Sequence, residues 1–346
     1  MTGAVSHTAV DPAKADALLE TMRAAGAADT GDRVVYLEQL EGGWSRHSFA
    51  ARVVHADGER EYIVRARPQG STLDTDLGQE FRVYSLLMDE PVPTPDVHGF
   101  EPAGDTPFGG PYFVMDRVEG YAPNVWRRRD RQALEEDWNG DRGIAGDLAD
   151  NLAGIHAIDA DRAAEAATVR DFRQTIDHWA GVYEEMRLVP DPVVDEAYAW
   201  VRAREPEPVP PALVHGDYRI GNCLTAGGRV TGILDWELCF VGDPRFDLGY
   251  MSLDYAAGKF TTPGSELLNA TAERGWFHER YAARSGNPVD PEVVRTFAAL
   301  GGLMLYAIMT TGVRVYHRSD AADIRLAWGR FVLPGLRQDL AALMDW

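Results

Sequence analysis

Two short apolar strands, each followed by polar side chains, constrain the fold of this chain more than any other feature. The first leads from Leu213 into His215-Gly216-Asp217, and Asn222 follows five residues after the aspartate. The second begins near Val230 and ends at Asp235. Apolar runs of this length predict strands, and the polar residues after them predict loops. We therefore expect two carboxylates and one amide at the mouths of neighbouring strands.

This set of side chains suits phosphoryl transfer from a nucleotide, in which a protein works mainly by positioning groups and neutralising charge. Asp217 would accept a hydrogen bond from the attacking hydroxyl. Asn222 and Asp235 would hold Mg²⁺, because this ion prefers oxygen ligands and usually takes one or two carboxylates. We count His215 among the catalytic residues. The alternatives are an ordinary turn, or a zinc pair of His215 and Asp217, which lacks the usual zinc spacing.

The stretch from Leu213 to Glu237 resembles the catalytic and metal-binding segments of the aminoglycoside phosphotransferase family, relatives of choline kinases and protein kinases. Within that family it is most similar to the kinase-like domain found beside some acyl-CoA dehydrogenases. The resemblance implies an α+β, two-lobed protein-kinase-like fold. Residues 1–116 would form a small antiparallel-sheet lobe with a leading helix, and residues 117–346 a larger, mainly helical lobe. The hinge would lie at about residues 116–120.

The segment 34–55 reads as strand, glycine turn, strand. Gly42 and Gly43 would let backbone N–H groups approach a phosphate closely, and Ser45 could add a hydroxyl. The alternative is an ordinary hairpin turn. Related sequences commonly carry asparagine after the serine, whereas this chain has Arg46.

The segment 61–67 predicts a further strand, and residues 79–88 have apolar side chains at helical spacing. By resemblance, Arg65 stands where kinases usually carry a lysine that holds the nucleotide phosphates. We therefore count it among both the catalytic and the cofactor-binding residues. Glu80 is its candidate partner, and the alternatives are a surface-paired arginine and a solvated glutamate. Arginine keeps the positive charge of lysine but presents a bulkier, planar group.

The segment 111–120 predicts a strand that runs into a turn. By resemblance it forms the hinge, where backbone groups from Asp116 to Val118 would meet the adenine edge and Met115 would lie behind it. No side chain in this segment is specific for one base. The expected cofactors are therefore ATP or GTP, with Mg²⁺.

Several features of the larger lobe are interpreted as structural. Asp247 would brace the catalytic loop, His156 would be a hydrogen-bonded core histidine, and the arginine-rich segment 125–131 would be a solvated charged surface rather than an anion site. Helices are expected after residue 265, with breaks at Gly275, at 285–288 and at Pro334.

The formal charge of −20, from 54 acidic and 34 basic residues, disfavours nucleic acid or an anionic membrane as a partner. Cys223 and Cys239 are expected to be small buried residues rather than a redox pair. The uncharged run 296–313 is long enough to span a membrane, but a buried helix is favoured. The residues before Val10 show no secretory signal. We expect a cytoplasmic monomer or homodimer.

The predicted partner is a small molecule with a hydroxyl acceptor. A hydroxyacyl compound or another metabolic alcohol is favoured over an aminoglycoside or macrolide antibiotic. A different class of function, a non-catalytic nucleotide-binding pseudokinase, stays open because of Arg46 and Arg65, although Asp217, Asn222 and Asp235 are all present.

Overall fold

The computed structural model describes residues 10–40, 46–68, 75–259, 264–318 and 324–346. The chain forms two compact units. The first contains residues 1–81 and 95–117, and the second contains residues 82–94 and 118–346. Gly42, Gly43 and Ser45, which we expect at a phosphate, lie outside the described residues.

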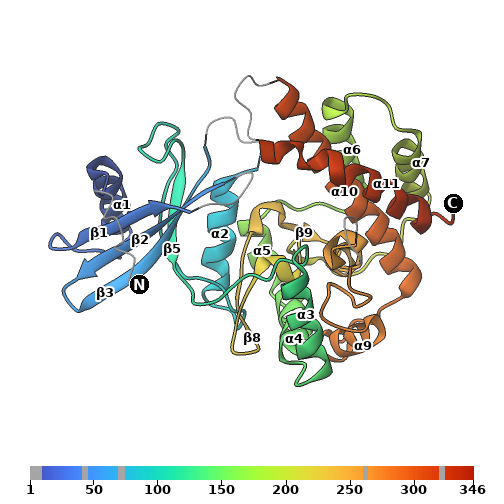
Figure 1. The fold of residues 1–346 in the computed structure, drawn as a ribbon, viewed down its shortest axis with the longest axis horizontal. Coiled ribbons are helices and arrows are strands. Elements are labelled where there is room, and N and C mark those ends of the chain that lie inside the picture. The colour runs from blue at the N-terminus through green and yellow to red at the C-terminus, as the bar shows by residue number, and fades with distance from the viewer. Residues whose placement is uncertain (1–9, 41–45, 69–74, 260–263, 319–323) are drawn as a thin grey trace. The chain divides into compact units, whose positions relative to one another are not determined.

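The first unit contains an antiparallel five-stranded sheet (Figure 1). In chain order its strands are β1 (Arg33–Gln39), β2 (His47–His55), β3 (Gly58–Ala66), β4 (Val97–Glu101) and β5 (Tyr112–Asp116). Their order in the sheet is β1-β2-β3-β5-β4. Strands β2 and β3 form a hairpin in which His55 pairs with Gly58. Gly58 has a backbone φ of +142°, a conformation that favours glycine. The expected α+β fold therefore has its antiparallel sheet in the N-terminal part.

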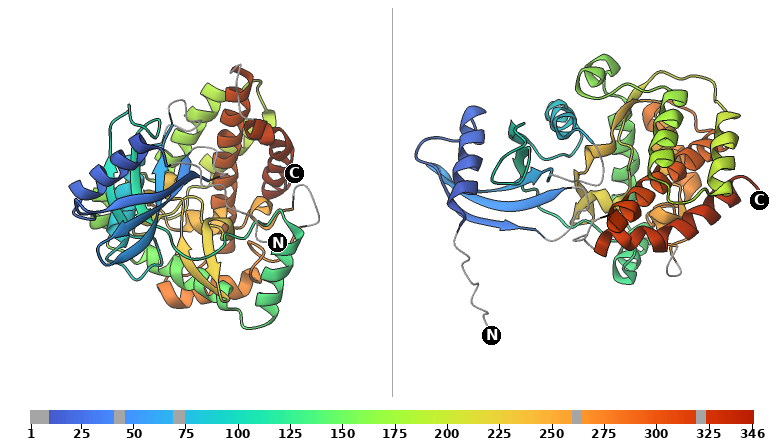
Figure 2. Two further views of the ribbon diagram at one scale, coloured as in Figure 1. Left: turned by 60° about the vertical axis from the view of Figure 1, so that its left-hand side comes forward. Right: turned by 90° about the horizontal axis from the view of Figure 1, so that it is seen from above.

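Helix α1 (Pro12–Ala24) lies against this sheet (Figures 1 and 2). Asp11 caps its first turn, and a proline at the first helical position does not sacrifice a needed hydrogen bond. Leu18, Leu19 and Met22 are buried with apolar side chains of the strands. The leading helix is therefore a packed part of the first unit. Helix α2 (Leu77–Leu87) continues from this unit into the second.

The second unit is mainly helical. Its helices are α3 (Arg128–Asn139), α4 (Gly143–His156), α5 (Ala160–Ala166), α6 (Phe172–Met186), α7 (Pro192–Arg202), α8 (Arg245–Tyr250), α9 (Arg274–Ser285), α10 (Pro291–Arg318) and α11 (Gly329–Leu343). Carboxylates of Asp159, Asp171 and Asp191 cap α5, α6 and α7 by accepting hydrogen bonds from backbone N–H groups. Some of the acidic residues therefore stabilise helix ends.

Among the described residues of the second unit, two short antiparallel pairs and four 3-10 helices complete the fold. The pairs are β6 (Ala212–Val214) with β9 (Phe240–Gly242), and β7 (Cys223–Ala226) with β8 (Arg229–Ile233). The 3-10 helices are η1 (Ile220–Asn222), η2 (Trp236–Leu238), η3 (Asp254–Ala257) and η4 (Ile324–Trp328). The predicted strands around residues 213 and 230 are thus β6 and β8.

Helix α10 is the core helix of the second unit. It is long and apolar enough to cross a membrane by composition, but 83% of its most apolar 18-residue window is buried inside the protein. It packs with α6, α8 and α11 around Phe297, Leu300 and Leu303. The structure therefore supports the predicted buried helix, because packing within the unit accounts for the apolar run.

Two predicted helix breaks are wrong, one expectation holds in part and one is confirmed. Gly275 lies in the first turn of α9 and Pro334 lies inside α11, so neither ends a helix. In the segment 125–131, Arg127, Arg128 and Arg129 are exposed as expected. Arg131 is not: it is 6% exposed and donates to the Val125 carbonyl. Cys223 and Cys239 are both buried and unbridged. Burial raises the pKa of the Cys223 thiol to about 12, which leaves it unreactive.

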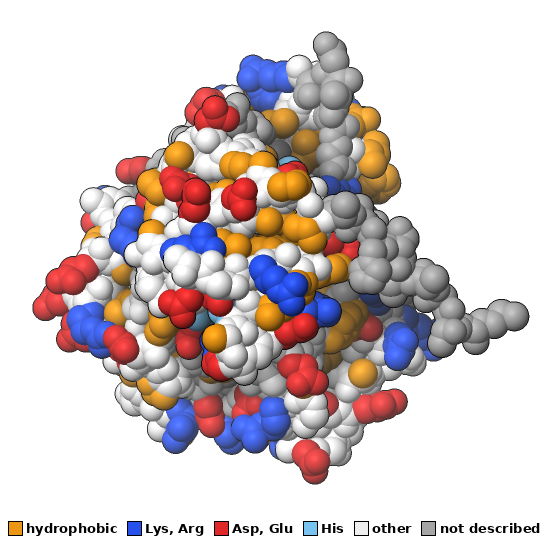
Figure 3. Space-filling view, turned by 90° about the vertical axis from the view of Figure 1, so that its left-hand side faces the viewer, with side chains coloured by type: hydrophobic (Ala, Val, Ile, Leu, Met, Phe, Trp, Pro, Cys, Tyr) orange, Lys and Arg blue, Asp and Glu red, His pale blue; other side chains and the backbone are white. Residues whose placement is uncertain are grey.

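One face of the molecule shows how charged side chains are distributed there. On the face drawn in Figure 3, acidic and basic side chains are interspersed. Exposed ion pairs of this kind contribute little to stability, typically below about 1 kcal/mol each. On this face the charges do not form a single anionic patch.

Asp339 on α11 is expected to make stability depend on pH. Burial raises its pKa to about 7, and the Asp254 carboxylate adds to this rise against Lys259 and Arg274. A raised carboxyl pKa contributes stability that is fully present below about pH 4 and is lost as the pH rises through about 7. Asp339→Asn should therefore raise the free energy of unfolding at pH 8 by roughly 2 kcal/mol.

Urea unfolding of Asp339→Asn and wild type at pH 5 and pH 8 measures this effect. The gain should be larger at pH 8, and Asp89→Asn, which replaces an 80% exposed carboxylate, is the control. An equal gain at both pH values would contradict the assignment.

Candidate active site

The His215-Gly216-Asp217 loop follows directly from β6 and is fixed by a buried carboxylate from α8. Asp247 is fully buried and accepts hydrogen bonds from the backbone N–H of His215 and of Gly216, both at 2.9 Å. His156 of α4 approaches the same carboxylate through Nε2 at 3.1 Å and contacts the Tyr281 hydroxyl through Nδ1 at 2.8 Å. The predictions that Asp247 braces this loop and that His156 is a satisfied core residue are confirmed.

Gly216 allows the sharp turn of this loop. Its backbone φ is +84°, and a Cβ atom here would lie 2.5 Å from the Leu238 carbonyl oxygen. Both the conformation and the close approach require glycine. Asp217 follows this turn directly, after the two backbone N–H groups that Asp247 holds.

His215 is fully buried beneath the loop. Its Nε2 atom lies 3.0 Å from the Leu234 carbonyl oxygen, and its Nδ1 atom accepts from the Asp217 backbone N–H at 3.2 Å. The ring packs on Trp236 with centroids 4.4 Å apart. Histidine therefore ties the Asp217 backbone to the end of β8.

Asp217 is contacted by two side chains of its own loop. The Nε atom of Arg219 donates to Oδ1 at 2.9 Å, and the Nδ2 atom of Asn222 donates to Oδ2 at 2.8 Å and to the Asp217 carbonyl at 2.9 Å. The carboxylate side chain is 14% exposed. Each carboxylate oxygen has a second acceptor position, so this arrangement still allows a hydroxyl donor to bind.

Arg219 is a site residue that the sequence interpretation missed. Burial alone would lower the pKa of its guanidinium, but the Asp217 carboxylate outweighs this effect and raises the pKa above its usual range. Burial also raises the pKa of the Tyr250 hydroxyl, with a further contribution from Asp217. Arg219 therefore stays charged and Tyr250 stays protonated near the carboxylate. The sequence feature that could have indicated this role is the position of Arg219, two residues after Asp217.

Asp235 lies at the end of β8 in the left-handed region, with φ 71° and ψ 55°. Aspartate is one of the few residues that adopt this conformation at modest cost, and such outliers cluster at functional sites. Its backbone N–H donates to the Tyr84 hydroxyl at 3.1 Å. The preceding residue, Leu234, donates its N–H to the Asn222 carbonyl at 2.8 Å.

The predicted base, Asp217, and the predicted metal ligands, Asn222 and Asp235, are thus connected through hydrogen bonds and a peptide bond. Asn222 contacts Asp217 through its side chain and Leu234 through its backbone, and Leu234 is adjacent to Asp235. The Asn222 amide turns its NH₂ group toward Asp217, an assignment that follows from the hydrogen-bond network. The structure brings together Asp217, Asn222 and His215 and links them to Asp235.

In the first unit, the predicted partners Arg65 and Glu80 meet. The Arg65 Nε atom and the Glu80 Oε1 atom are 2.5 Å apart. Their geometry is not that of an aligned hydrogen bond, so the contact is an ion pair. Glu80 is fully buried on α2, and Arg65 lies on β3 opposite Ser48 of β2 and Phe113 of β5.

The predicted hinge residues lie at the end of β5. Met115 is 6% exposed and pairs with Ile63. The Asp116 N–H donates to the Asp96 carbonyl, and the Arg117 N–H donates to the Glu61 carbonyl. Both N–H groups would have to break these hydrogen bonds to bind adenine. Val118 belongs to the second unit.

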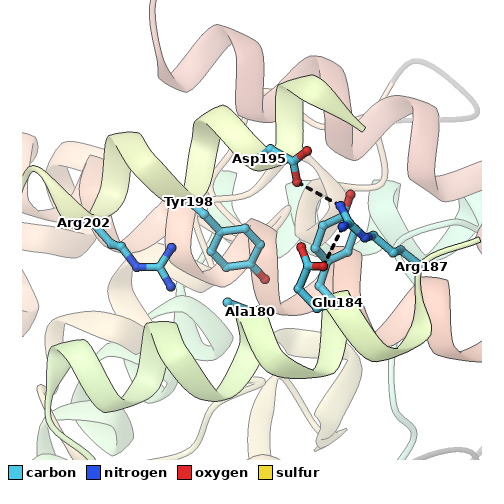
Figure 4. Close-up of a pocket in the computed structure, with 7 residues that line it drawn as sticks. Ala180, Glu184, Arg187, Asp195, Tyr198 and Arg202 are labelled. Atoms are coloured by element: carbon cyan, nitrogen blue, oxygen red, sulfur yellow. Dashed lines mark ion pairs between the residues drawn. The ribbon is translucent and has the colours of Figure 1, made fainter. Parts of the chain in front are cut away.

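A pocket of about 380 Å³ lies between α6 and α7 (Figure 4). It is lined by Ala180, Tyr183, Glu184, Arg187, Asp195, Tyr198 and Arg202. Arg187 lies 2.6 Å from Glu184 and 3.5 Å from Asp195. None of the predicted site residues lines this pocket, and Arg202 pairs with Asp177 outside it. We therefore assign it no part in the reaction.

The chemistry that this arrangement permits is limited. Within the described residues, no group of three histidine, cysteine, aspartate or glutamate side chains could hold a metal ion. One aspartate and one asparagine match the sparse oxygen set with which proteins bind Mg²⁺ when phosphates supply further ligands. Together with a carboxylate base, this donor set is that of a nucleotide-dependent kinase-like site.

The fold and the site define a protein of the kinase-like class, and comparison with a protein-family model gives the family. The model described as "Phosphotransferase enzyme family" matches residues 37–286. The chain belongs to this family, of the aminoglycoside phosphotransferase and choline kinase type.

Among curated relatives, acyl-CoA dehydrogenase family member 10 of Mus musculus is 26% identical over 231 residues. The match covers 63% of this chain and 20% of the mouse protein. Acyl-CoA dehydrogenase family member 11 of Rattus norvegicus is 26% identical over 234 residues, covering 64% of this chain and 28% of the rat protein. The matched region is thus less than a third of either relative.

Solved structures share the fold at lower identity. A provisionally named aminoglycoside phosphotransferase from Ralstonia eutropha has a TM-score of 0.68 at 20% identity, covering 94% of this chain and 97% of its own. A choline/ethanolamine kinase family protein from Mesorhizobium loti has a TM-score of 0.60 at 18% identity, covering 90% and 88%. A thermostable aminoglycoside phosphotransferase mutant, in a ternary complex with ADP and hygromycin B, has a TM-score of 0.56 at 18% identity, covering 89% and 95%.

Proposed function

We propose that this protein transfers the terminal phosphoryl group of ATP or GTP, with Mg²⁺, to a hydroxyl group of a small molecule. The observation that carries this proposal is the Asp217 carboxylate, held at its two oxygens by Arg219 and Asn222 and presented on a loop braced by Asp247. A fixed carboxylate is what a hydroxyl acceptor needs, because catalysis of phosphoryl transfer depends mainly on positioning.

In this proposal Asp217 accepts the hydrogen bond of the attacking hydroxyl. Asn222 and Asp235 hold Mg²⁺, which when bound neutralises charge on the phosphates. His215 positions Asp217 from beneath the loop, since its ring is buried and bonded within the site. Arg65, paired with Glu80, contacts the nucleotide phosphates, and Gly42, Gly43 and Ser45 would cradle them. Met115, Asp116 and Val118 would border the adenine. Direct transfer needs no phosphoenzyme.

The acceptor class is the finer part of the proposal. The curated relatives are named as acyl-CoA dehydrogenase family members, which supports a hydroxyacyl compound or a related metabolic alcohol. One structural neighbour binds hygromycin B, which keeps an antibiotic acceptor as the alternative.

The test is nucleotide consumption with Mg²⁺ against hydroxy acids, hydroxyacyl-coenzyme A thioesters, aminoglycosides and macrolides. Acceptor-dependent release of ADP or GDP by the wild type is the expected result. Asp235→Asn should lower this turnover by roughly 10²- to 10³-fold and raise the Mg²⁺ concentration needed, because the metal supplies several kcal/mol of charge stabilisation.

Two results would contradict the proposal. One is an Asp235→Asn variant with an unchanged Mg²⁺ requirement, which would remove this residue from the metal site. The other is tight nucleotide binding with no phosphoryl transfer to any acceptor, which would favour the non-catalytic alternative.

A further inference from the structure

The buried Glu80 carboxylate pairs with two arginines, not one. Its Oε1 atom lies 2.5 Å from Arg65 Nε, and its Oε2 atom accepts from Arg46 Nε at 3.3 Å. The Nη2 group of Arg46 also donates to the Thr75 hydroxyl at 2.7 Å. Arg46 thus connects the residue before β2 with the start of α2. The resemblance to other family members did not predict this contact.

Burial distinguishes the two arginines. The Glu80 side chain is 0% exposed, that of Arg46 is 2% exposed, and that of Arg65 is 13% exposed. A buried charge is stable only when it is paired, and one guanidinium would already neutralise one carboxylate. The three side chains together carry a net charge of +1. The second arginine therefore does more than satisfy the charge of Glu80.

The two arginines approach different oxygens of Glu80. Arg46 donates to Oε2, and Arg65 lies against Oε1. Arg46 is in turn held by Thr75. Arg46 therefore fixes the orientation of the Glu80 carboxylate, and through it the place at which the Arg65 guanidinium is paired.

Direct contact of Arg46 with a phosphate does not fit this geometry. Its side chain is almost fully buried, whereas a phosphate-binding arginine presents its guanidinium to the ligand. Arg46 stands where related sequences commonly carry asparagine, so this device is not implied by the family pattern.

We propose that Arg46 is a positioning residue for nucleotide binding: by holding Oε2 of Glu80, it fixes the Arg65 guanidinium for the nucleotide phosphates. This inference rests on the proposed function, since it assigns Arg65 to the phosphates. It predicts that Arg46 acts on nucleotide affinity through Arg65, and that the two residues are energetically coupled.

A double-mutant cycle tests the coupling. The dissociation constants of Mg·ADP and Mg·GDP are measured by titration calorimetry for wild type, Arg46→Met, Arg65→Met and the double variant. Arg46→Met should weaken binding of the preferred nucleotide by about tenfold in the wild-type background and by less than about twofold in the Arg65→Met background. Arg46→Lys, which keeps the charge but loses the fork, should fall between wild type and Arg46→Met.

The control is Arg52→Met, which removes an arginine of β2 that is 43% exposed and pairs with Glu59 and Glu61. It should leave nucleotide affinity unchanged. Equal weakening by Arg46→Met in both backgrounds would overturn the inference, because it would indicate a general effect on the fold. If Arg46→Met does not fold, the same comparison with Arg46→Lys decides. Absence of nucleotide binding by the wild type would instead overturn the proposed function, and this inference with it.

Discussion

Asp217→Asn is expected to lower kcat by about 10²- to 10⁴-fold, the range that a positioned general base contributes. Asparagine has nearly the same shape but cannot accept the proton of the attacking hydroxyl. The substitution also removes the negative charge that faces Arg219, which is paired with this carboxylate at 2.9 Å. Nucleotide affinity should change by less than about twofold, since the proposed metal ligands and the arginine proposed to bind phosphate are intact.

Single-turnover phosphoryl transfer and calorimetric binding of Mg·ADP, each on wild type and variant, separate the two effects. Asp57→Asn, at a 65% exposed carboxylate of the first unit, is the control for the chemical change alone. A variant that retains more than a tenth of the wild-type rate would show that Asp217 is not the base. A variant that loses nucleotide binding would place Asp217 among the nucleotide ligands instead.

Sequence patterns predicted those parts of the fold that depend on short-range order. The apolar helix α10 and the strands that carry the site are each encoded by a local pattern of apolar residues. The bracing role of Asp247 was predicted by its family segment, and the structure shows both of its backbone contacts.

Features that depend on contacts between distant residues were beyond the sequence. Tyr84 lies 151 residues before Asp235, whose backbone it contacts, and Arg46 lies 34 residues before Glu80. The spacing of apolar residues along the sequence does not predict contacts between residues so far apart. Pro334 lies inside α11 because burial of its neighbours Val332 and Leu336 compensates for a lost helical hydrogen bond. Local propensity alone therefore placed a helix end where tertiary packing continues the helix.

Asp247→Asn is expected to lower the free energy of unfolding by about 2–4 kcal/mol. The fully buried carboxylate accepts from the N–H groups of His215 and Gly216, and His156 lies 3.1 Å from it. An asparagine amide has one oxygen and one NH₂ group, so at least one of these donors would face another donor. Urea unfolding measures the loss, and kcat should fall as well, because the loop that carries Asp217 loses its support.

Asp159→Asn is the matched control, since it makes the same chemical change at a helix cap where asparagine serves equally well. Its stability should stay within about 0.5 kcal/mol of wild type. Comparison of Asp247→Asn with Asp217→Asn then separates support from chemistry: the first should lower stability more, because its carboxylate is fully buried, whereas the second should lower kcat more, because it removes the proposed base. Unchanged urea unfolding of Asp247→Asn would mean that its hydrogen bonds do not hold the loop, and the positioning of Asp217 would then have to come from Arg219, Asn222 and His215.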